Sequence, residues 1–294
     1  MAKRILIIHN PEAGKGKQAQ LAQVVRCLDE RGAQITQIST QHSDDAEEIA
    51  RSESKANFDV IAVAGGDGTL QQVVNGLGEQ SPPLALIPVG TANVVAIEMG
   101  LMRNGQMIDA DLLADIILKG ETKTICAGAI NERLFVFTAG VGFDANVVAA
   151  VSSSLKKKIG KLAFVAAAIR TLFTYKYPLL SLSIDGQKYR GAGVIVMNGQ
   201  YYGGNYTITP ENNLADPDFA VLVLKRAGRM AGLSYLVSLA QGKLHKRQDV
   251  IYLKNVRLID VDGPADLPCQ ADGEVSGHLP VQIRADVKQV ELIV

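Results

Sequence analysis

The sequence lacks most of the features that mark secreted, membrane-spanning and nucleic-acid-binding proteins. Its only cysteines are Cys27, Cys126 and Cys269, and their odd number and wide spacing argue against a disulfide framework and favour buried thiols in a reducing cytoplasm. Thirty basic residues balance thirty acidic ones, so no overall field attracts the chain to nucleic acid or to an anionic membrane. No apolar run reaches the roughly 18 residues that span a bilayer, and Ile5–Ile8 is too short for a signal peptide. We therefore expect a cytoplasmic protein, at most peripheral on the inner face of the membrane.

Three familiar site patterns are also missing. The four histidines show no ligand-like spacing, so each is expected to be structural or exposed. The loop at residues 10–17 is not a Walker A loop, because neither of its Gly-Lys pairs is followed by Ser or Thr. It matches G-x-G-x-x-A, but the second predicted strand ends without the acidic residue that holds a ribose in dinucleotide sites. Lys15 and Lys17 in this loop either act as cations near phosphate or are solvated.

What the sequence does contain is a glycine turn of the kind that binds phosphate. The buried strand Val60–Ala64 runs into the turn Gly65–Thr69 and then into the helix-like segment Leu70–Leu77. Glycines let the backbone approach a ligand closely, and the N–H groups that open a helix point toward an anion. A carboxylate at Asp67 repels phosphate unless a cation lies between them, so the pattern favours Mg²⁺ with a nucleotide. A glycine-rich turn after a strand also occurs in α/β proteins that bind no phosphate.

A second glycine turn, Gly90–Asn93, follows the predicted strand Leu84–Val89 and opens another helical run. Loops at the carboxyl ends of neighbouring parallel strands face one crevice, where open α/β sheets bind their ligands. Thr91 and Asn93 either hydrogen-bond phosphate or ribose, or cap the helix.

The pattern of apolar runs changes near residue 125. Before it, strands and helices alternate, which predicts a parallel sheet with crossover helices. The expected strands are Arg4–His9, Gln34–Ile38, Val60–Ala64 and Leu84–Val89, and the expected helices are Lys17–Arg31, Asp44–Ser54, Leu70–Leu77 and Asp109–Leu118. After it, strand-like runs dominate, at Leu134–Ala139, Leu179–Ile184, Gly193–Met197, Tyr206–Thr209, Phe219–Leu224, Val250–Leu253, Val256–Val261 and Gln289–Val294, with helices at Ser153–Tyr175 and Ala227–His245.

These segments predict an α/β fold of two domains. The first, residues 1–125, is an open, mostly parallel α/β nucleotide-binding domain. The second, residues 126–294, is a mainly antiparallel, β-sandwich-like domain whose last strand returns to the first domain. Asp185-Gly186 is the clearest hairpin turn. We expect the site in the cleft between the domains.

The downstream sequence Asp272-Gly273-Glu274 has two interpretations. In an extended chain the two carboxylates share one side, so that one assists a metal and the other takes a proton from an attacking hydroxyl. Alternatively, the three residues form an acidic hairpin turn.

With these motifs in view, the chain resembles the bacterial diacylglycerol kinase-like lipid kinases, which share a catalytic region with sphingosine and ceramide kinases and are distantly similar to NAD kinases. The similarity covers nearly the whole length. Its anchors, in the family's order, are Asn10-Pro11 with Gly14, Gly65–Thr69, Gly90–Asn93, Ala139–Asp144, Asn198-Gly199 with Gly203-Gly204, Thr209-Pro210, and Asp272–Glu274.

The resemblance implies specific site residues. Glu274 would be the general base that deprotonates a lipid hydroxyl for attack on the γ-phosphate of ATP, with Asp67 and Asp272 contributing around Mg²⁺. The nucleotide site would comprise Thr40, Gly65, Gly66, Asp67, Gly68, Thr69, Leu70, Gln71, Gly90, Thr91 and Asn93. A second, structural Mg²⁺ would be held at Asn213, Asp216 and Asp218.

Two departures from the family pattern qualify these expectations. Many diacylglycerol kinases have Asp where this chain has Val94, so a sphingoid base, ceramide or another lipid alcohol stays open beside diacylglycerol. Pro217 replaces the usual glycine after Asp216 and fixes φ there, which counts against the second metal.

A lipid substrate requires contact with a membrane surface. The segment Ser153–Val165 combines four lysines with the start of an apolar helix, and each lysine near anionic headgroups contributes roughly 1 kcal/mol. It is either a site of transient membrane contact or an ordinary helix with a solvated end.

Three function classes follow. The leading one is an ATP-dependent lipid kinase; the others are a kinase of a soluble alcohol or nucleotide, as in the NAD kinase relatives, and a non-catalytic nucleotide- or lipid-binding regulator. The expected partners are ATP, a lipid alcohol and, transiently, a membrane surface, with a homodimer left open and no nucleic acid.

Overall fold

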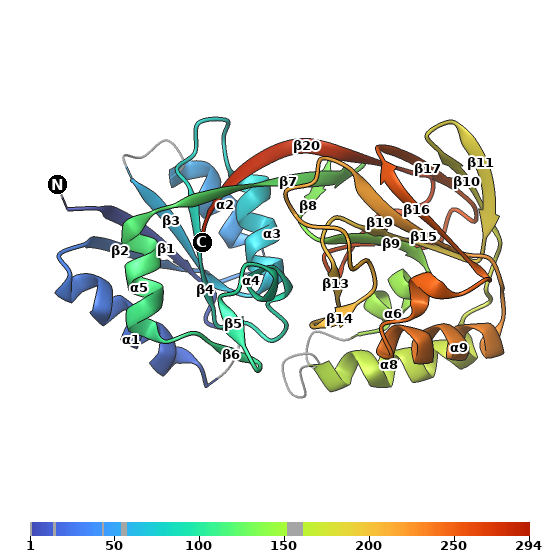
Figure 1. Ribbon diagram of the computed structural model, residues 1–294, viewed down its shortest axis with the longest axis horizontal. Coiled ribbons are helices and arrows are strands. Elements are labelled where there is room, and N and C mark those ends of the chain that lie inside the picture. The colour runs from blue at the N-terminus through green and yellow to red at the C-terminus, as the bar shows by residue number, and fades with distance from the viewer. Residues whose placement is uncertain (1, 14–15, 43, 54–57, 152–160) are drawn as a thin grey trace. The chain divides into compact units, whose positions relative to one another are not determined.

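The computed structural model describes residues 2–13, 16–42, 44–53, 58–151 and 161–294. The chain forms two compact units, one comprising Met1–Ile125 with Gln289–Val294 and the other Cys126–Lys288 (Figure 1). Within the described residues, no helix is both long enough and apolar enough to cross a bilayer.

The first unit is built on a parallel sheet with the strand order β2-β1-β3-β4. Its strands are β1 (Arg4–His9), β2 (Gln34–Ser39), β3 (Val60–Gly65) and β4 (Leu84–Pro88). Every residue of β3 and β4 is buried, as expected for strands covered on both faces. His9 pairs with Ser39, and Gly65 pairs with Pro88, so the carboxyl ends of the four strands meet at one edge of the sheet.

Helices connect these strands. They are α1 (Gln18–Glu30), α2 (Asp45–Glu53), α3 (Asp67–Gly76), α4 (Val94–Glu98) and α5 (Ala110–Lys119), with a small hairpin of β5 (Met102–Arg103) and β6 (Gln106–Met107) before α5. α1 packs beside α5, and α2 packs beside α3 (Figure 1). α3 begins at Asp67 rather than at Leu70, because Gly66 and not Thr69 is its N-cap. The motif's aspartate therefore lies in the first turn of the helix.

The second unit contains two antiparallel sheets. One has the order β11-β10-β17-β20, and the other has the order β16-β15-β12-β9-β18-β19. The first sheet comprises β10 (Leu180–Ile184), β11 (Gln187–Gly191), β17 (Leu258–Asp262) and β20 (Val281–Ile293), with β7 (Thr122–Ile130) and β8 (Arg133–Phe135) paired to it. The second comprises β9 (Thr138–Gly142), β12 (Gly193–Met197), β15 (Phe219–Leu224), β16 (Val250–Val256), β18 (Pro268–Ala271) and β19 (Glu274–His278).

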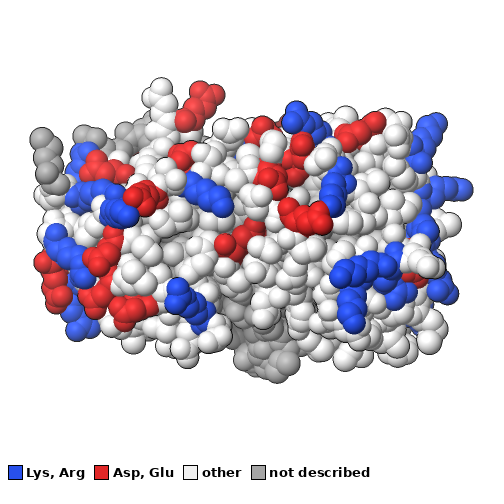
Figure 2. Space-filling model, viewed as in Figure 1, with Lys and Arg blue, Asp and Glu red and all other residues white. Residues whose placement is uncertain are grey.

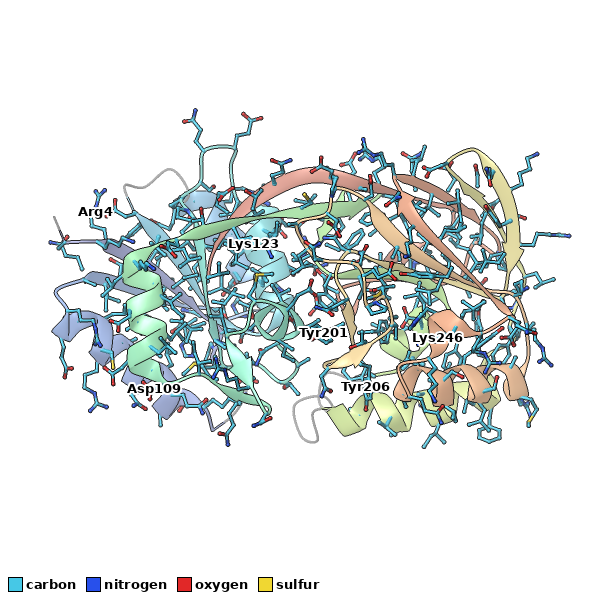
Figure 3. The ribbon with its side chains drawn as sticks, viewed as in Figure 1. Arg4, Asp109, Lys123, Tyr201, Tyr206 and Lys246 are labelled. Atoms are coloured by element: carbon cyan, nitrogen blue, oxygen red, sulfur yellow. The ribbon has the colours of Figure 1, made fainter. Side chains whose placement is uncertain are left out.

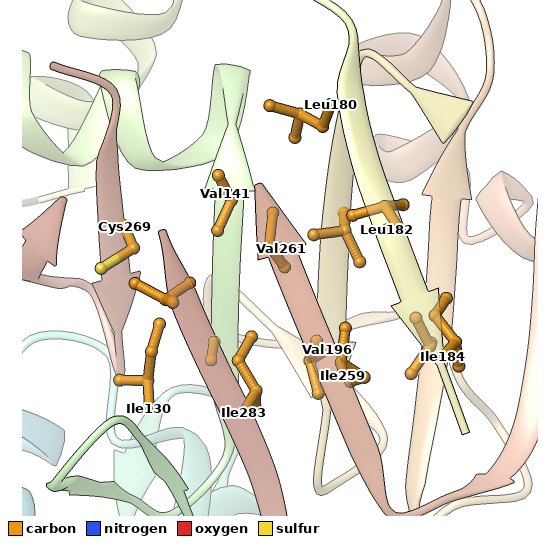
Figure 4. Packing of buried hydrophobic residues seen from close by; sticks show 14 of the residues in the cluster. Ile130, Val141, Leu180, Leu182, Ile184, Val196, Ile259, Val261, Cys269 and Ile283 are labelled. Atoms are coloured by element: carbon orange, nitrogen blue, oxygen red, sulfur yellow. The ribbon is translucent and has the colours of Figure 1, made fainter. Parts of the chain in front are cut away.

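Apolar side chains from both sheets form one core in this unit. Ile130, Ile259 and Ile283 of the first sheet and Val141, Val196 and Cys269 of the second belong to the same buried cluster (Figure 4). Alternate residues of each strand supply this core, which is the packing of a β-sandwich. The predicted fold class, a parallel α/β part followed by an antiparallel sandwich, is confirmed.

The remaining elements of the second unit are α6 (Phe143–Ala150), α8 (Lys161–Thr174), α9 (Arg229–Ala240), the 3₁₀ turn η1 (Leu244–Lys246) and a small hairpin of β13 (Tyr201–Tyr202) and β14 (Tyr206–Thr207). The final strand β20 pairs antiparallel with β17, and its Leu292 pairs parallel with Leu84 of β4.

Three expectations about elements were wrong or fall outside the described residues. The single strand expected at Leu134–Ala139 is divided between β8 and β9, and the amides of Val136 and Phe137 bond a side chain at the break. Sequence patterns also missed α6 and β7. Of the basic segment expected to touch a membrane, residues 152–160 lie outside the described part of the chain.

Candidate active site

The two glycine turns of the first unit pack backbone against backbone. The amide of Gly90 donates to the carbonyl of Gly65 at 2.9 Å. A Cβ added at Gly90 would lie 2.3 Å from the Cα of Gly66, and one added at Gly65 would lie 2.5 Å from the Thr69 hydroxyl oxygen. These contacts require glycine, and they leave a backbone cradle beside the N-terminus of α3, where the first-turn amides have no intrahelical acceptor.

Asp67 ties this cradle to the next helix. Its Oδ1 accepts a hydrogen bond from the backbone amide of Val95 at 3.2 Å, so a carboxylate at the start of α3 caps α4. Burial raises the pKa of the Asp67 carboxyl, and hydrogen bonds from the amides of Val94 and Val95 oppose that rise. The carboxylate is thus held at the cradle by main-chain contacts.

Asn93 leaves an unused acceptor inside the cradle. The residue is 3 % exposed and left-handed, with φ of 53°, and its Nδ2 donates to the carbonyls of Pro88 at 3.1 Å and Gly90 at 3.0 Å. Its Oδ1 is buried without a hydrogen-bond partner among the described residues. An ionised phosphate oxygen only accepts, so this oxygen fits a donor: a hydroxyl, an amine or a water.

The loop after β1 supplies two further contacts to the cradle. Asn10 donates from Nδ2 to the Thr69 hydroxyl at 3.2 Å, which links the first loop to the glycine turn. Lys17, at the start of α1, donates from Nζ to the carbonyl of Gly90 at 2.8 Å. Sequence reasoning left this lysine open between a phosphate cation and a solvated residue, and the structure places its ammonium on the second glycine loop.

The other expected nucleotide residues lie after β2, in the first turns of α3 and on the second glycine loop. Thr40 follows β2 and is buried, with its amide bonded to the carbonyl of His9 at 2.8 Å. Gly68 lies in the first turn of α3, and Thr91 is exposed on the second loop. Leu70 lines a pocket together with Gly65, Gly66, Asp67 and Asn93, whereas Gln71 is buried in α3 with 1 % exposure.

Glu274 and Asp272 belong to the second unit and have different surroundings. Asp272 and Gly273, with φ of 50° and 80°, form the two-residue turn of the β18–β19 hairpin, and Glu274 pairs with Ala271 as the first residue of β19. The extended arrangement, with both carboxylates on one side of the chain, therefore does not occur. Of the two interpretations left open, the hairpin turn holds, because positive φ at Asp272 and Gly273 reverses the chain.

The Asp272 carboxylate binds backbone. It accepts hydrogen bonds from the amides of Val136 at 2.6 Å, Phe137 at 2.9 Å and Thr138 at 3.0 Å, and the residue is 6 % exposed. These bonds hold the hairpin turn against the β8–β9 break. Glu274 is partly exposed, and no residue in the described part of the chain makes a hydrogen bond or ion pair with its carboxylate.

The expected second metal segment is a turn whose carboxylates are engaged. Asp216 accepts from the amide of Asn213 at 3.0 Å, and Asn213 accepts from the amide of Ala215 at 2.9 Å. Asp218 forms an ion pair with Arg257 at 2.6 Å. Across the described residues, no three His, Cys, Asp or Glu side chains gather as a metal site. Two of the three expected ligands thus have partners inside the turn and the third has Arg257, and the second metal stays a prediction.

A half-buried acid with no role assigned from the sequence lies near the acidic hairpin. Asp144, at the start of α6, accepts hydrogen bonds from the Tyr202 hydroxyl and, at 2.8 Å, from Gln270 Nε2. Gln270 in turn accepts from the amide of Gly273 at 2.9 Å. A chain of bonds thus runs from Asp144 to the residue before Glu274. Burial raises the pKa of Asp144 to about 6, against the lowering effect of Gln270.

This pKa predicts a pH-dependent stability. The folded-state pKa lies above the ordinary value, so the folded protein binds the proton more tightly, and stability falls as pH rises from about 4 toward 7. A pKa shift corresponds to about 1.4 kcal/mol of unfolding free energy per unit, which is an upper bound for a partly exposed residue because solvent screens its charge. We therefore expect Asp144→Asn to raise the free energy of unfolding by about 2 kcal/mol at pH 8 and by little at pH 4. Urea unfolding at both pH values measures this.

Asp249 provides a control, because its pKa is shifted in the opposite direction. Its hydrogen bond with Arg247 lowers the pKa of its carboxyl, so Asp249→Asn should destabilise the protein above pH 4. If Asp144→Asn were equally destabilising at pH 8, Asp144 would be ionised and favourably paired in the folded state, contrary to this account.

Fold and site together define a class: an α/β unit in which two glycine turns pack backbone against backbone, and a β-sandwich that carries an acidic hairpin. Residues 4–130 match the diacylglycerol kinase catalytic domain family, and residues 138–294 match the YegS C-terminal NAD kinase beta sandwich-like domain family. The chain is 30% identical over 283 residues to a diacylglycerol kinase of Bacillus subtilis (strain 168), with 95% of this chain and 92% of that protein covered. A diacylglycerol kinase of Staphylococcus saprophyticus is 28% identical over 287 residues, covering 95% of this chain and 92% of that protein.

Solved structures agree with these matches. A crystal structure of a diacylglycerol kinase from Bacillus anthracis str. Sterne superposes with a TM-score of 0.75 at 27% identity, covering 99% of this chain and 96% of that one. The chain belongs to the diacylglycerol kinase family, as its resemblance indicated.

Proposed function

We propose that this chain is an ATP-dependent lipid kinase that transfers the γ-phosphate to the hydroxyl of a lipid alcohol. The observation that carries the proposal is the glycine cradle of Gly65, Gly66 and Gly90, where two loops pack backbone against backbone beside the N-terminus of α3. The family supports kinase chemistry on an alcohol, and the named relatives are diacylglycerol kinases.

The residues of the cradle fit a metal-bound nucleotide. First-turn amides of α3 would bind phosphate oxygens, and Lys17 would add a positive charge at Gly90. The unpartnered Asn93 Oδ1 would accept from a donor on the ligand side, such as a ribose hydroxyl or a water. Asp67 would hold Mg²⁺, which neutralises phosphate charge during transfer.

Glu274 would act as the general base in this proposal. Its carboxylate takes the proton of the lipid hydroxyl while that oxygen forms a bond to the γ-phosphorus. The bond between the γ-phosphorus and the bridging oxygen breaks, and ADP leaves with the electron pair. Asp272, fully engaged with backbone amides, would position the hairpin that bears Glu274.

We propose the acceptor only as a class, the lipid alcohols, and not as one particular lipid. Val94 is 1 % exposed at the start of α4, so an apolar side chain occupies the position where many diacylglycerol kinases carry a carboxylate. Diacylglycerol, a sphingoid base and ceramide each offer a primary hydroxyl to the proposed base.

The test is a transfer assay with ATP labelled at the γ-phosphate, Mg²⁺, and a panel of detergent-dispersed lipids with NAD included. We expect label in a lipid phosphate that depends on both ATP and Mg²⁺. Label appearing only in NAD would support a soluble-substrate kinase instead. Binding of ATP without transfer to any acceptor would favour a non-catalytic regulator. A series of competing nucleotides would identify the phosphate donor.

The cradle itself makes a separate prediction. Gly90→Ala should weaken ATP binding at least tenfold, about 1.4 kcal/mol, because its Cβ would lie 2.3 Å from the Cα of Gly66 and force the two loops apart. Gly193→Ala in β12 of the second unit is the matched control, since its Cβ would meet the carbonyl oxygen of Val141 at 3.3 Å and requires only a small shift outside the cradle. Equilibrium dialysis with ATP measures both. Equal affinity of Gly90→Ala and the unsubstituted protein would place the nucleotide elsewhere.

A further inference from the structure

Two anchors hold the turn of the acidic hairpin. The Asp272 carboxylate provides the first, because it accepts hydrogen bonds from three backbone amides. Gln270 of β18 provides the second, because its Oε1 accepts a hydrogen bond from the amide of Gly273 at 2.9 Å. Gly273 directly precedes Glu274 in the chain. The anchor at Gln270 therefore acts on the residue next to the proposed base.

Both ends of the Gln270 side chain are bonded inside the protein. The residue is 1 % exposed, and its Nε2 donates to Asp144 Oδ2 at 2.8 Å. An ionised carboxylate only accepts hydrogen bonds and a backbone amide only donates them, so a single orientation of the Gln270 amide satisfies both partners. Turned by half a rotation, the side chain would present its oxygen to the carboxylate and its NH₂ to the N–H of Gly273. Asp144 thus directs Oε1 of Gln270 toward the turn.

A glycine in the neighbouring strand leaves room for this bond. Gly140 of β9 pairs with Gln270 of β18. A Cβ added at Gly140 would lie 2.2 Å from Asp144 Oδ2 and 3.1 Å from Gln270 Nε2. Because the first distance is far shorter than an ordinary contact, a larger residue would push the carboxylate away from the amide. The helix α6, which begins beside Asp144, packs against β9, β18 and β19, so the bond joins this helix to the hairpin.

The Asp144 carboxylate is also held through its other oxygen. Its Oδ1 accepts from the hydroxyl of Tyr202 in the β13–β14 hairpin, in which Figure 3 labels Tyr201 and Tyr206. Figure 2 shows acidic and basic side chains side by side on the surface, where water screens their interactions. Gln270 is buried instead, so water does not replace a partner that is lost there. Tyr202, Asp144 and Gln270 therefore form a fixed support for the turn.

We propose that Gln270 and Asp144 are positioning residues for the general base: they hold the acidic turn so that the Glu274 carboxylate is presented in one place. This inference rests on the proposed function, because Glu274 acts as a base only if the chain is a lipid kinase. In the described part of the chain the Glu274 carboxylate makes no hydrogen bond or ion pair, so the backbone of the turn sets its position. Misplacement of a catalytic group by about 1 Å costs about a hundredfold in rate.

The first test removes both hydrogen bonds of the Gln270 side chain with Gln270→Met, which keeps its length. We expect kcat for phosphorylation of detergent-dispersed lipid to fall at least tenfold, while the affinity for ATP stays unchanged because the glycine cradle belongs to the first unit. The matched control is Gln282→Met, which breaks another bond of 2.8 Å, from Gln282 Nε2 to Asp260 Oδ1, between β20 and β17 of the other sheet. It should keep the original kcat. Initial rates at saturating ATP and equilibrium dialysis measure the two quantities.

The second test exchanges the two functional groups. Gln270→Glu alone places two carboxylates against each other and should lower kcat at least tenfold at pH 8. Adding Asp144→Asn restores a donor to the new carboxylate, which still accepts from the amide of Gly273. We expect the double substitution to regain most of the lost kcat. Side-chain volumes barely change in these variants, so a pair that acted only through packing would show no such recovery.

Two results would overturn the inference while the kinase proposal stands. One is an unchanged kcat in Gln270→Met. The other is a double substitution, Asp144→Asn with Gln270→Glu, that is as slow as Gln270→Glu alone. Thermal unfolding verifies that each variant is folded at the assay temperature. If Gln270→Met is not folded there, the exchanged pair decides, because it keeps every hydrogen bond of the support.

Hydrogen exchange separates this inference from the proposed function, because it requires no catalysis. The amide of Gly273 should exchange at least tenfold faster in Gln270→Met than in the unsubstituted protein or in Gln282→Met. If the unsubstituted protein phosphorylates no lipid, the kinase proposal fails, and protection of Gly273 that depends on Gln270 still demonstrates the anchored turn. Equal exchange at Gly273 in all three proteins would refute the anchor itself.

Discussion

Replacing Glu274 by glutamine should lower kcat for lipid phosphorylation by about 10²–10⁴-fold, the usual contribution of a general base. Glutamine has nearly the same shape but cannot take the hydroxyl proton. Glu274 is partly exposed and has no hydrogen-bond or ion-pair partner in the described part of the chain, so its loss should not disturb the fold. The affinity for ATP should be unchanged, because no nucleotide contact is assigned to this side chain. Initial rates at saturating ATP and equilibrium binding measure the two effects.

A suitable control is Glu132→Gln, because Glu132 is an exposed carboxylate on another two-residue turn, between β7 and β8. It should retain full activity. If Glu274→Gln transferred phosphate at the original rate, the base would have to be another group. If its rate fell together with its unfolding midpoint, the side chain would be structural.

Replacing Asp272 by alanine should lower the free energy of unfolding by about 3 kcal/mol or more. The change leaves the buried amides of Val136, Phe137 and Thr138 without their acceptor, and each unpaired buried donor costs roughly 1–3 kcal/mol before the structure relaxes. Asp272→Asn should be less damaging, because Oδ1 can still accept from Phe137 and Thr138 while its new NH₂ faces the amide of Val136. Urea denaturation measures the series.

The exposed Asp266, near the same hairpin, supplies the control, and Asp266→Ala should change stability by less than about 0.5 kcal/mol. The series also separates two roles for Asp272. If Asp272→Ala loses more stability than Asp272→Asn, the carboxylate acts as an acceptor for backbone amides. Unchanged stability with collapsed kcat would instead restore the metal-binding role that the family resemblance implied.

The two Asp-Gly turns show how far local sequence information reaches. Asp185-Gly186 was predicted as a hairpin, and Ile184 pairs with Gln187 across it, with φ of 45° and 80° at the turn residues. Asp272-Gly273 has nearly the same conformation, with φ of 50° and 80°, yet its sequence left an extended arrangement open. The flanking runs explain the difference, because clear apolar alternation marks the strand before Asp185 and not the short polar strand after Gly273.

Long-range contacts account for the other misses. A continuous apolar run predicted one strand at Leu134–Ala139, but the carboxylate of Asp272, more than a hundred residues later, binds the amides of Val136 and Phe137 at the break and that of Thr138 at the start of β9. Lys17 was ambiguous because its acceptor, the Gly90 carbonyl, belongs to a loop 73 residues away. The Asp144–Gln270 bond likewise spans 126 positions. Periodicity reports which face of an element is buried and carries no information about such partners.

By itself the sequence determined the α/β and antiparallel organisation, the two glycine turns and the family, because apolar period, glycine position and motif order are properties of the chain alone. Only the tertiary structure decided that Asp67 caps a neighbouring helix, that Asp272 binds backbone and leaves Glu274 as the unengaged carboxylate of its hairpin, and that a chain of bonds from Asp144 reaches the same hairpin. Each of those outcomes depends on which distant amides and side chains come within hydrogen-bonding or packing distance, and that is set by the folded chain.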